Sequence, residues 1–165
     1  MDLGIHMLDL GWYLLGQPKA TSVFGVAHQK FAEQGSETVF DVEDAAFAMI
    51  RFENGKSLEL ATSWSLNQPP SQNGAMCRLY GSQGAIELYT PDGPVLYRSF
   101  GAKGECKENP LKGPKVVNHA ALARHFRECI KGEATPVCGG AEGVALMEMV
   151  EAVYKSAETG RSVAM

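Results

Sequence analysis

Four side chains that can transfer protons or form hydrogen bonds recur at helical spacing near the start of the chain. Because an α-helix turns by about 100° per residue, positions separated by four, three and four residues fall on one narrow face. An imidazole exchanges protons close to neutral pH, and a carboxylate one turn away can orient it. This face is therefore the best candidate for acid–base chemistry in the sequence. The four residues are Asp2, His6, Asp9 and Tyr13.

The remaining residues of this stretch are almost all apolar, which predicts a buried helix over residues 2–15. Gly16 and Pro18 are expected to end it, because glycine suits the left-handed position after a helix and proline cannot continue the turn. A polar group on a buried helix needs a partner, since leaving it unsatisfied costs about 1–3 kcal/mol. We therefore expect the polar face to line a cleft, where a ligand or water satisfies it.

Three of these polar residues also have a purely structural interpretation. His6 could be a core histidine bonded to a backbone carbonyl, and Asp2 could be a helix N-cap. Asp9 is more simply explained as a partner for a loop amide. The three together also resemble a metal-binding face. No defined partner supplies a fourth ligand, so we predict no metal site.

Size and composition favour a single globular domain over residues 1–165, or one domain with a small appendage. The chain has 45% hydrophobic residues and a formal net charge of −4, without a run of Lys or Arg, so neither nucleic acid nor an anionic membrane is an expected partner. No apolar stretch approaches the ~20 residues of a membrane helix, and no basic segment precedes the first apolar run, so we expect a cytoplasmic protein. The four cysteines form no C-x-x-C pair and are expected to be free thiols.

A β-hairpin is the clearest secondary-structure signal. Residues 45–53 and 56–66 flank Asn54-Gly55, a pair that tolerates the positive φ angles of a two-residue type I′ turn. Counting outward from such a turn pairs Met49 with Leu60. This register predicts a core face and, opposite it, a small-residue face that is covered, as at a subunit interface. The predicted core face comprises Phe47, Met49, Arg51, Leu58, Leu60, Thr62 and Trp64, and the other face Ala46, Ala48, Ile50, Phe52, Ser57, Glu59, Ala61 and Ser63.

The rest of the chain supplies further strands and then helices, which predicts an α+β fold with a mostly antiparallel open sheet and helices packed on one face. Polar and glycine-containing residues 31–41 and 101–115 are expected to be loops. Strands are predicted at 20–30, 75–80, 85–89 and 95–100, and two helices at the end, the first with the apolar stripe Leu122, Phe126, Cys129 and Ile130, the second ending near Gly160.

Two further clusters are weaker candidates for a site. The segment Gly139–Gly143 resembles a phosphate cradle, but no Lys-Ser/Thr pair accompanies it, so a plain helix start is favoured. Asp41, Glu43 and Asp44 precede the predicted hairpin and are expected to be solvated or to cap a strand.

Imidazole and aromatic groups elsewhere could also contact a ligand. His119 and His125 are expected to be surface or packing residues, although His119 could approach the cleft. Trp64 is expected to pack in the core rather than to stack on a sugar.

Several of these segments, in this order, resemble the C-terminal substrate domain of the Gfo/Idh/MocA (glucose-fructose oxidoreductase / inositol dehydrogenase) family. The resemblance spans nearly the whole chain, and its most specific element is the D-x-x-x-H pair formed by Asp2 and His6. The other segments are Leu14-Leu15-Gly16-Gln17-Pro18, Asp41-Val42-Glu43-Asp44-Ala45, Asn54-Gly55, Trp64 and Ser156-Ala157-Glu158-Thr159-Gly160-Arg161-Ser162-Val163.

This resemblance implies an enzyme that moves hydride between NAD or NADP and a hydroxyl of a sugar, cyclitol or related polyol. It implies that His6 is the general base and that Asp2 orients it or binds a second hydroxyl. Asp9, Tyr13, His119 and Trp64 are weaker substrate-binding candidates, and the family's second domain also forms the homo-oligomer through its sheet face.

The sequence departs from the family pattern because it lacks the dinucleotide-binding domain, with its Gly-rich loop and catalytic lysine. No G-x-G-x-x-G follows a predicted strand, so we expect no cofactor-binding residue in this chain, no activity of the chain alone, and a fragment or truncated product. The alternative is a standalone, non-catalytic module that binds a small molecule or assembles through its sheet.

Overall fold

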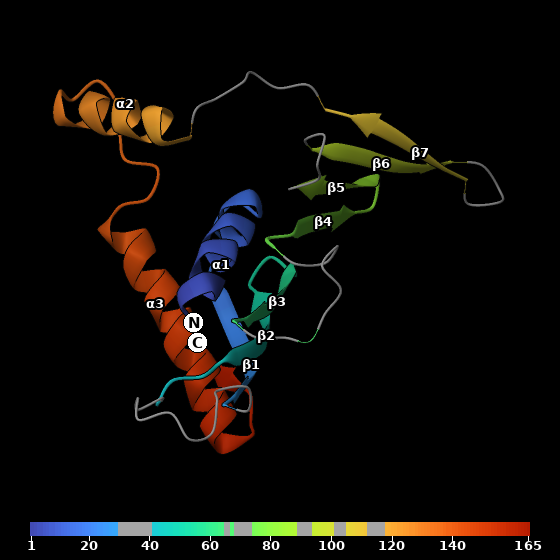
Figure 1. Ribbon diagram of the computed structural model, residues 1–165, viewed down its shortest axis with the longest axis vertical. Helices are drawn as coiled ribbons and strands as arrows, with labels where there is room; N and C mark the ends of the chain where they lie inside the picture. Colours follow the sequence, from blue (N-terminus) through green and yellow to red (C-terminus); the bar gives the residue numbers. More distant parts are fainter. Residues whose placement is uncertain (30–40, 65–66, 68–73, 89–93, 101–104, 112–117) are drawn as a thin grey trace. The chain divides into compact units, whose positions relative to one another are not determined.

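The structure is a computed structural model that describes residues 1–29, 41–64, 67, 74–88, 94–100, 105–111 and 118–165 (Figure 1). The chain divides into two compact units. The first combines Met1–Ala75 with Ala145–Met165, and the second is Met76–Val144.

The first unit is an antiparallel sheet of strand order β3-β2-β1-β8 with two helices. The predicted first helix, first strand, hairpin and last helix are all present. The predicted loop at 31–41 lies outside the described residues except for Asp41. The elements are α1 Asp2–Leu14, β1 Ala20–His28, β2 Ala45–Phe52, β3 Ser57–Ser63, α3 Gly140–Thr159 and β8 Val163–Ala164.

The β2–β3 hairpin exists, but the predicted register is wrong by one residue. Leu60 pairs with Ala48, not with Met49. The turn has three residues rather than two: the Phe52 N–H donates to the Lys56 carbonyl at 3.0 Å, and only Gly55, with φ of 80°, has a positive φ. This is the geometry of the three-residue hairpin loop with glycine in the left-handed position. Since side chains alternate along a strand, a shift of one residue exchanges the two faces of β2.

The face of β2 that was predicted to be a subunit interface is therefore the hydrophobic core. Ala48, Ile50 and Phe52 are buried there beside Leu58 and Leu60 of β3. The residues predicted to form the core on β2 lie on the opposite face, where Met49 and Arg51 are exposed. Helix residues complete the core from α1 and α3, namely Leu8, Trp12, Leu146, Met149, Val150, Ala152 and Val153.

Helix α3 approaches β1 closely at Gly25. A Cβ atom on Gly25 would lie 3.1 Å from both the Cα and the carbonyl oxygen of Val153, so only glycine allows this contact. The buried Ser156 hydroxyl accepts the Gly25 N–H at 2.9 Å and donates to the Arg161 carbonyl at 2.7 Å. These bonds satisfy a buried hydroxyl and attach the end of α3 to the sheet.

The second unit contains an antiparallel sheet of order β4-β5-β6-β7 and one helix. Three of its strands were predicted; the fourth, β7, falls inside residues 101–115, which were expected to be a loop. The Gly, Lys and Pro content of residues 101–115 conceals this strand, which pairs with β6 along its whole length. The elements are β4 Cys77–Gly81, β5 Gly84–Leu88, β6 Val95–Phe100, β7 Glu105–Pro110 and α2 Asn118–Ile130.

The α+β class with antiparallel, open sheets is confirmed, although the strands form two sheets rather than one. No disulfide joins the four cysteines, all of which lie in the described part of the chain. None of the helices described is both long enough and apolar enough to cross a membrane.

Candidate active site on the first helix

The close packing of α1 on β3 determines which way its polar face points. Gly4 and Gly11 lie against the sheet: a Cβ on Gly4 would be 2.8 Å from Thr62 Cγ2, and one on Gly11 would be 2.7 Å from Leu58 Cδ1. Leu8 and Trp12 are buried on the same face of the helix. The polar positions are rotated by roughly half a turn about the helix axis from these buried residues, so they lie on the opposite face of the helix.

Asp2, His6 and Tyr13 are exposed on this outer face, and Asp9 is half-buried. The interpretation of His6 as a core histidine is therefore wrong. Asp2 is not the N-cap either, because Met1 occupies that position and makes no side-chain cap, whereas Asp2 is the first helical residue. A carboxylate in the first turn still interacts favourably with the helix dipole.

Helix α1 is only half-buried, contrary to the prediction of a buried helix. Leu3 and Leu14 are among its exposed side chains. The predicted end is confirmed: Gly16 has φ of 86°, and the Gln17 N–H donates to the Trp12 carbonyl at 2.9 Å. At the same end, Lys56 Nζ donates to the Leu15 carbonyl at 2.7 Å and so satisfies a terminal acceptor.

The predicted cleft around the polar face stays a prediction. One hollow, of about 540 Å³, lies on the β4–β5–β6 part of the second unit and is lined by residues that include Arg78, Glu87 and Tyr97. Another, of about 580 Å³, lies at the end of α3 and is lined by residues that include Lys155 and Arg161. Neither hollow is lined by a residue of α1.

The remaining predicted substrate-binding residues lie elsewhere. Trp64 is 64% exposed, so its predicted packing in the core is wrong: it is in phase with the buried Leu58 and Leu60 but lies beyond the end of β3 at Ser63. His119 is exposed in the first turn of α2. His125, one and a half turns further along α2, has Nε2 3.6 Å from Cys129 Sγ.

The start of α3 does not fit a dinucleotide phosphate. Glu142 Oε2 accepts the Gly139 N–H at 2.8 Å, which satisfies a free donor at the helix start with a side chain of the same helix. A carboxylate at this position repels a phosphate group. The prediction of a plain helix start is thus confirmed: α3 begins at Gly140.

No group of three or more His, Cys, Asp or Glu side chains in the described ranges lies close enough together to hold a metal ion.

The acidic residues before β2 are buried to an extent that the sequence did not predict. Only Asp41 is exposed; the Glu43 side chain is 12% exposed, and Asp44 is buried. The Asp44 carbonyl accepts hydrogen bonds from Ser63 Oγ at 2.8 Å and from the Trp64 N–H at 3.0 Å, which connects the start of β2 to the end of β3.

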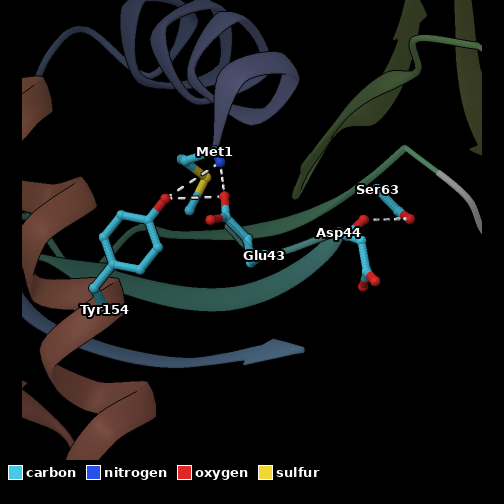
Figure 2. Close-up of polar contacts among 5 residues, drawn as sticks. All are labelled: Met1, Glu43, Asp44, Ser63 and Tyr154. Atoms are coloured by element: carbon cyan, nitrogen blue, oxygen red, sulfur yellow. Dashed lines mark hydrogen bonds and ion pairs between the residues drawn. The ribbon is translucent and has the colours of Figure 1, made fainter. Parts of the chain in front are cut away.

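Glu43 contacts a residue that the sequence did not single out. Figure 2 shows the Tyr154 hydroxyl, from α3, directed at the Glu43 carboxylate, with an O···O distance of 2.9 Å, and at the Met1 nitrogen, 3.2 Å away. The Met1 nitrogen also forms an ion pair with Glu43. Partial burial raises the pKa of the Tyr154 phenol, which stays protonated and donates. No sequence pattern could link these residues, because Glu43 and Tyr154 are 111 positions apart.

An antiparallel sheet covered on one face by helices, with Asp2 and His6 on the outer side of the first helix, defines an α+β domain. Over residues 1–165 the chain matches the C-terminal alpha/beta domain of an oxidoreductase family, Gfo/Idh/MocA, and belongs to that family.

Characterised relatives include D-glucoside 3-dehydrogenase of Escherichia coli (strain K12), which is 28% identical over 176 residues, a match that covers 99% of this chain and 47% of that protein. Among solved structures, levoglucosan dehydrogenase in complex with NADH and L-sorbose has a TM-score of 0.79 at 20% identity, covering 99% of this chain and 48% of that one. Aldose-aldose oxidoreductase from Caulobacter crescentus, complexed with glycerol, has a TM-score of 0.74 at 24% identity, covering 98% and 46%. The two structures support the fold. The chain spans about half the length of the relatives it matches.

Proposed function

We propose that this chain is the substrate-binding part of an NAD(P)-dependent dehydrogenase that acts on a CH–OH group of a sugar, cyclitol or related polyol. The observation that carries the proposal is the Asp2–His6 pair, which lies solvent-accessible on the outer face of α1 in a chain that matches the family domain over its whole length. The relatives named above act on sugars or bind them, as their names and ligands state.

In this proposal His6 takes the proton of the substrate hydroxyl while hydride leaves the same carbon. An imidazole suits this step because it exchanges protons near neutral pH, where general-base catalysis is most efficient. Asp2, one turn earlier, orients the imidazole or accepts a hydrogen bond from a second hydroxyl of the substrate. Asp9, Tyr13, His119 and Trp64 are secondary candidates for holding the substrate.

The nicotinamide cofactor, NAD or NADP, would accept the hydride. It would be bound at a site that another part of the intact protein supplies. The glycine cluster at the start of α3 does not fit it, because Glu142 already accepts the Gly139 N–H there. The chain alone is accordingly expected to be inactive and to show no saturable NAD(P)H binding in a fluorescence titration.

A change at His6 tests the catalytic role. In the intact gene product that contains this sequence, His6→Asn is expected to lower kcat/KM for sugar-dependent NAD(P)⁺ reduction by about 10²–10⁴-fold, the usual contribution of a general base. The measurement is the absorbance of NAD(P)H at 340 nm. His125→Asn is a matched control, because His125 is a histidine of α2 that neither the candidate site nor the proposed interface includes. Equal losses in the two variants would refute the role of His6.

The alternative is a module that binds a sugar without converting it. It would be supported if this 165-residue chain binds sugars at α1 while the intact gene product reduces neither NAD⁺ nor NADP⁺ with any sugar tested. The dehydrogenase proposal requires that the intact gene product reduces NAD⁺ or NADP⁺ with a sugar.

We also propose that the chain forms a homo-oligomer through the open face of the first sheet. Phe24 and Met49 are paired across β1 and β2 on that face and are 47% and 43% exposed, and Phe47 lies beside Val26. Neighbouring apolar side chains on an uncovered sheet face are typical of an interface.

Light scattering after gel filtration tests this interface. Met49→Lys is expected to convert an oligomer into monomers, because it places a charge within the apolar face. Met147→Lys, an equally exposed methionine on α3, is the control and should keep the wild-type mass. A monomeric wild-type chain, or a Met49→Lys variant of unchanged mass, would exclude this interface.

A further inference from the structure

Three residues from distant parts of the sequence meet at the start of α1, and we refer to Met1, Glu43 and Tyr154 as the Glu43 cluster (Figure 2). The Tyr154 hydroxyl donates to Glu43 Oε1, and the Met1 nitrogen contacts both groups. The side chains of Met1 and Glu43 are 5% and 12% exposed. Because these polar groups are largely withdrawn from water, their mutual contacts matter to the position of the segment that they hold.

The cluster supplies what α1 lacks at its start. The first N–H groups of a helix have no partner inside the helix, and the N-cap residue Met1 provides no side-chain acceptor. The Glu43 carboxylate, which comes from the segment before β2, accepts from the Met1 nitrogen instead. In a longer chain this nitrogen would be a peptide N–H and could donate to the same carboxylate. A negative charge at this end also interacts favourably with the helix dipole.

The same helical turn is held from its other side by β3. A Cβ on Gly4 would lie 2.8 Å from Thr62 Cγ2 and 3.1 Å from Thr62 Cβ, so the backbone of the turn rests directly on the strand. Gly4 lies midway between Asp2 and His6 in the sequence. The turn that presents both candidate catalytic residues is thus held by a polar contact on one side and by close packing on the other.

We propose that Glu43 and Tyr154 are positioning residues, which hold the first turn of α1 so that Asp2 and His6 point to a substrate on its outer face. This inference rests on the proposed function, which gives Asp2 and His6 a substrate to point to. The Tyr154 hydroxyl acts through Glu43, and Glu43 acts through the start of the helix. Neither residue needs to touch the substrate.

Four single variants of the full chain test the proposal by NMR. Tyr154→Phe deletes the hydroxyl donor, Glu43→Leu deletes the carboxylate, and Glu43→Gln keeps an acceptor of the same shape. Thr159→Ala is the control, because it also deletes one hydroxyl of α3, which donates to the Lys155 carbonyl within that helix. Thermal unfolding by circular dichroism first establishes that each variant is folded.

The first readout is hydrogen exchange of the Ile5 amide, which donates to the Met1 carbonyl at 3.1 Å and reports the first helical hydrogen bond. Exchange relative to the Val23 amide of β1 is expected to rise about fivefold in Tyr154→Phe and more in Glu43→Leu, as when about one hydrogen bond of net stabilisation is lost locally. Glu43→Gln should recover most of the protection, and Thr159→Ala should leave it unchanged. Unchanged protection in Tyr154→Phe and Glu43→Leu, or equal losses in Glu43→Gln and Glu43→Leu, would overturn the proposal.

The second readout is the shift of the His6 ring signals during a titration with D-glucose. The dissociation constant is expected to rise at least about threefold in Tyr154→Phe and Glu43→Leu, since a misdirected pair loses part of one hydrogen bond to the sugar. Wild-type affinity in both variants would contradict the positioning role even if exchange at Ile5 increased. A wild-type chain whose His6 ring responds to no sugar, cyclitol or polyol tested would instead contradict the proposed function, and the exchange data would then decide separately whether the cluster holds the turn.

Discussion

Tyr154 carries a phenol that the fold places against a carboxylate, and this makes its ionisation sensitive to folding. Burial raises the pKa of Tyr154 above its usual value of 10.0. Ionisation would put a phenolate 2.9 Å from Glu43 Oε1, where it could no longer donate and would repel the carboxylate. The folded chain therefore favours the neutral phenol.

This gives a prediction for stability in alkali. A group whose pKa is raised by folding stabilises the native state below its unfolded pKa of about 10, and this contribution is lost as the pH rises through the folded pKa. The wild-type chain should therefore lose more stability between pH 9 and pH 11 than Tyr154→Phe, as measured by urea unfolding. Because lysines titrate in both proteins, the comparison isolates Tyr154. Parallel stability curves would contradict a role for its ionisation.

At this scale the sequence predicted part of the candidate site. Helical spacing alone placed Asp2, His6 and Tyr13 on one face, since local periodicity determines which residues share a side of a helix. It could not find Glu43 or Tyr154, which meet only through the packing of α3 and the segment before β2. The acidic cluster looked solvated because nothing local to it shows that Glu43 and Asp44 are covered.

The β2–β3 hairpin shows how the length of a turn determines which face of a strand is buried. Asn54-Gly55 is compatible with a two-residue turn and also with a three-residue turn that includes Glu53, and the two differ by one residue in register. Alternation could not choose between them, because both faces of β2 are rich in apolar residues. The choice depends on tertiary packing, in which α1 and α3 cover Ile50 and Leu58.

The close contact of α3 with β1 at Gly25 can be tested by substitution. Gly25→Ala should lower the free energy of unfolding by about 1–3 kcal/mol, because its Cβ would meet the Val153 backbone and overpack the core. Gly143→Ala makes the same substitution inside α3, where no atom lies within 4 Å and φ is not positive. It should stabilise the chain by up to about 1 kcal/mol through helix propensity. Urea unfolding of both variants measures the difference, and a destabilised Gly143→Ala or an unaffected Gly25→Ala would contradict the packing described.

The whole chain is organised so that its two ends build one unit. The core of the first unit joins Leu8, Val23 and Ile50 from the N-terminal segment to Met149 and Val153 near the C-terminus. The intervening residues form the second unit, with a sheet of their own. Composition predicted enough apolar content for one core but could not reveal this division, because it depends on contacts between residues more than a hundred positions apart.

Since the first unit has its own core, residues 76–144 should be replaceable by a flexible linker of about 20 Gly and Ser residues without unfolding it. The loop-closure cost changes little, by about 0.6 kcal/mol for each twofold change in length. Trp12 is buried in this core and donates to the Pro18 carbonyl at 2.8 Å, so in a Trp64→Phe background its fluorescence reports folding. We expect a cooperative urea transition for the shortened chain. Removal of residues 145–165 should abolish the transition, because it takes Met149 and Val153 out of the core. A shortened chain without a transition would mean that the second unit is required for the first to fold.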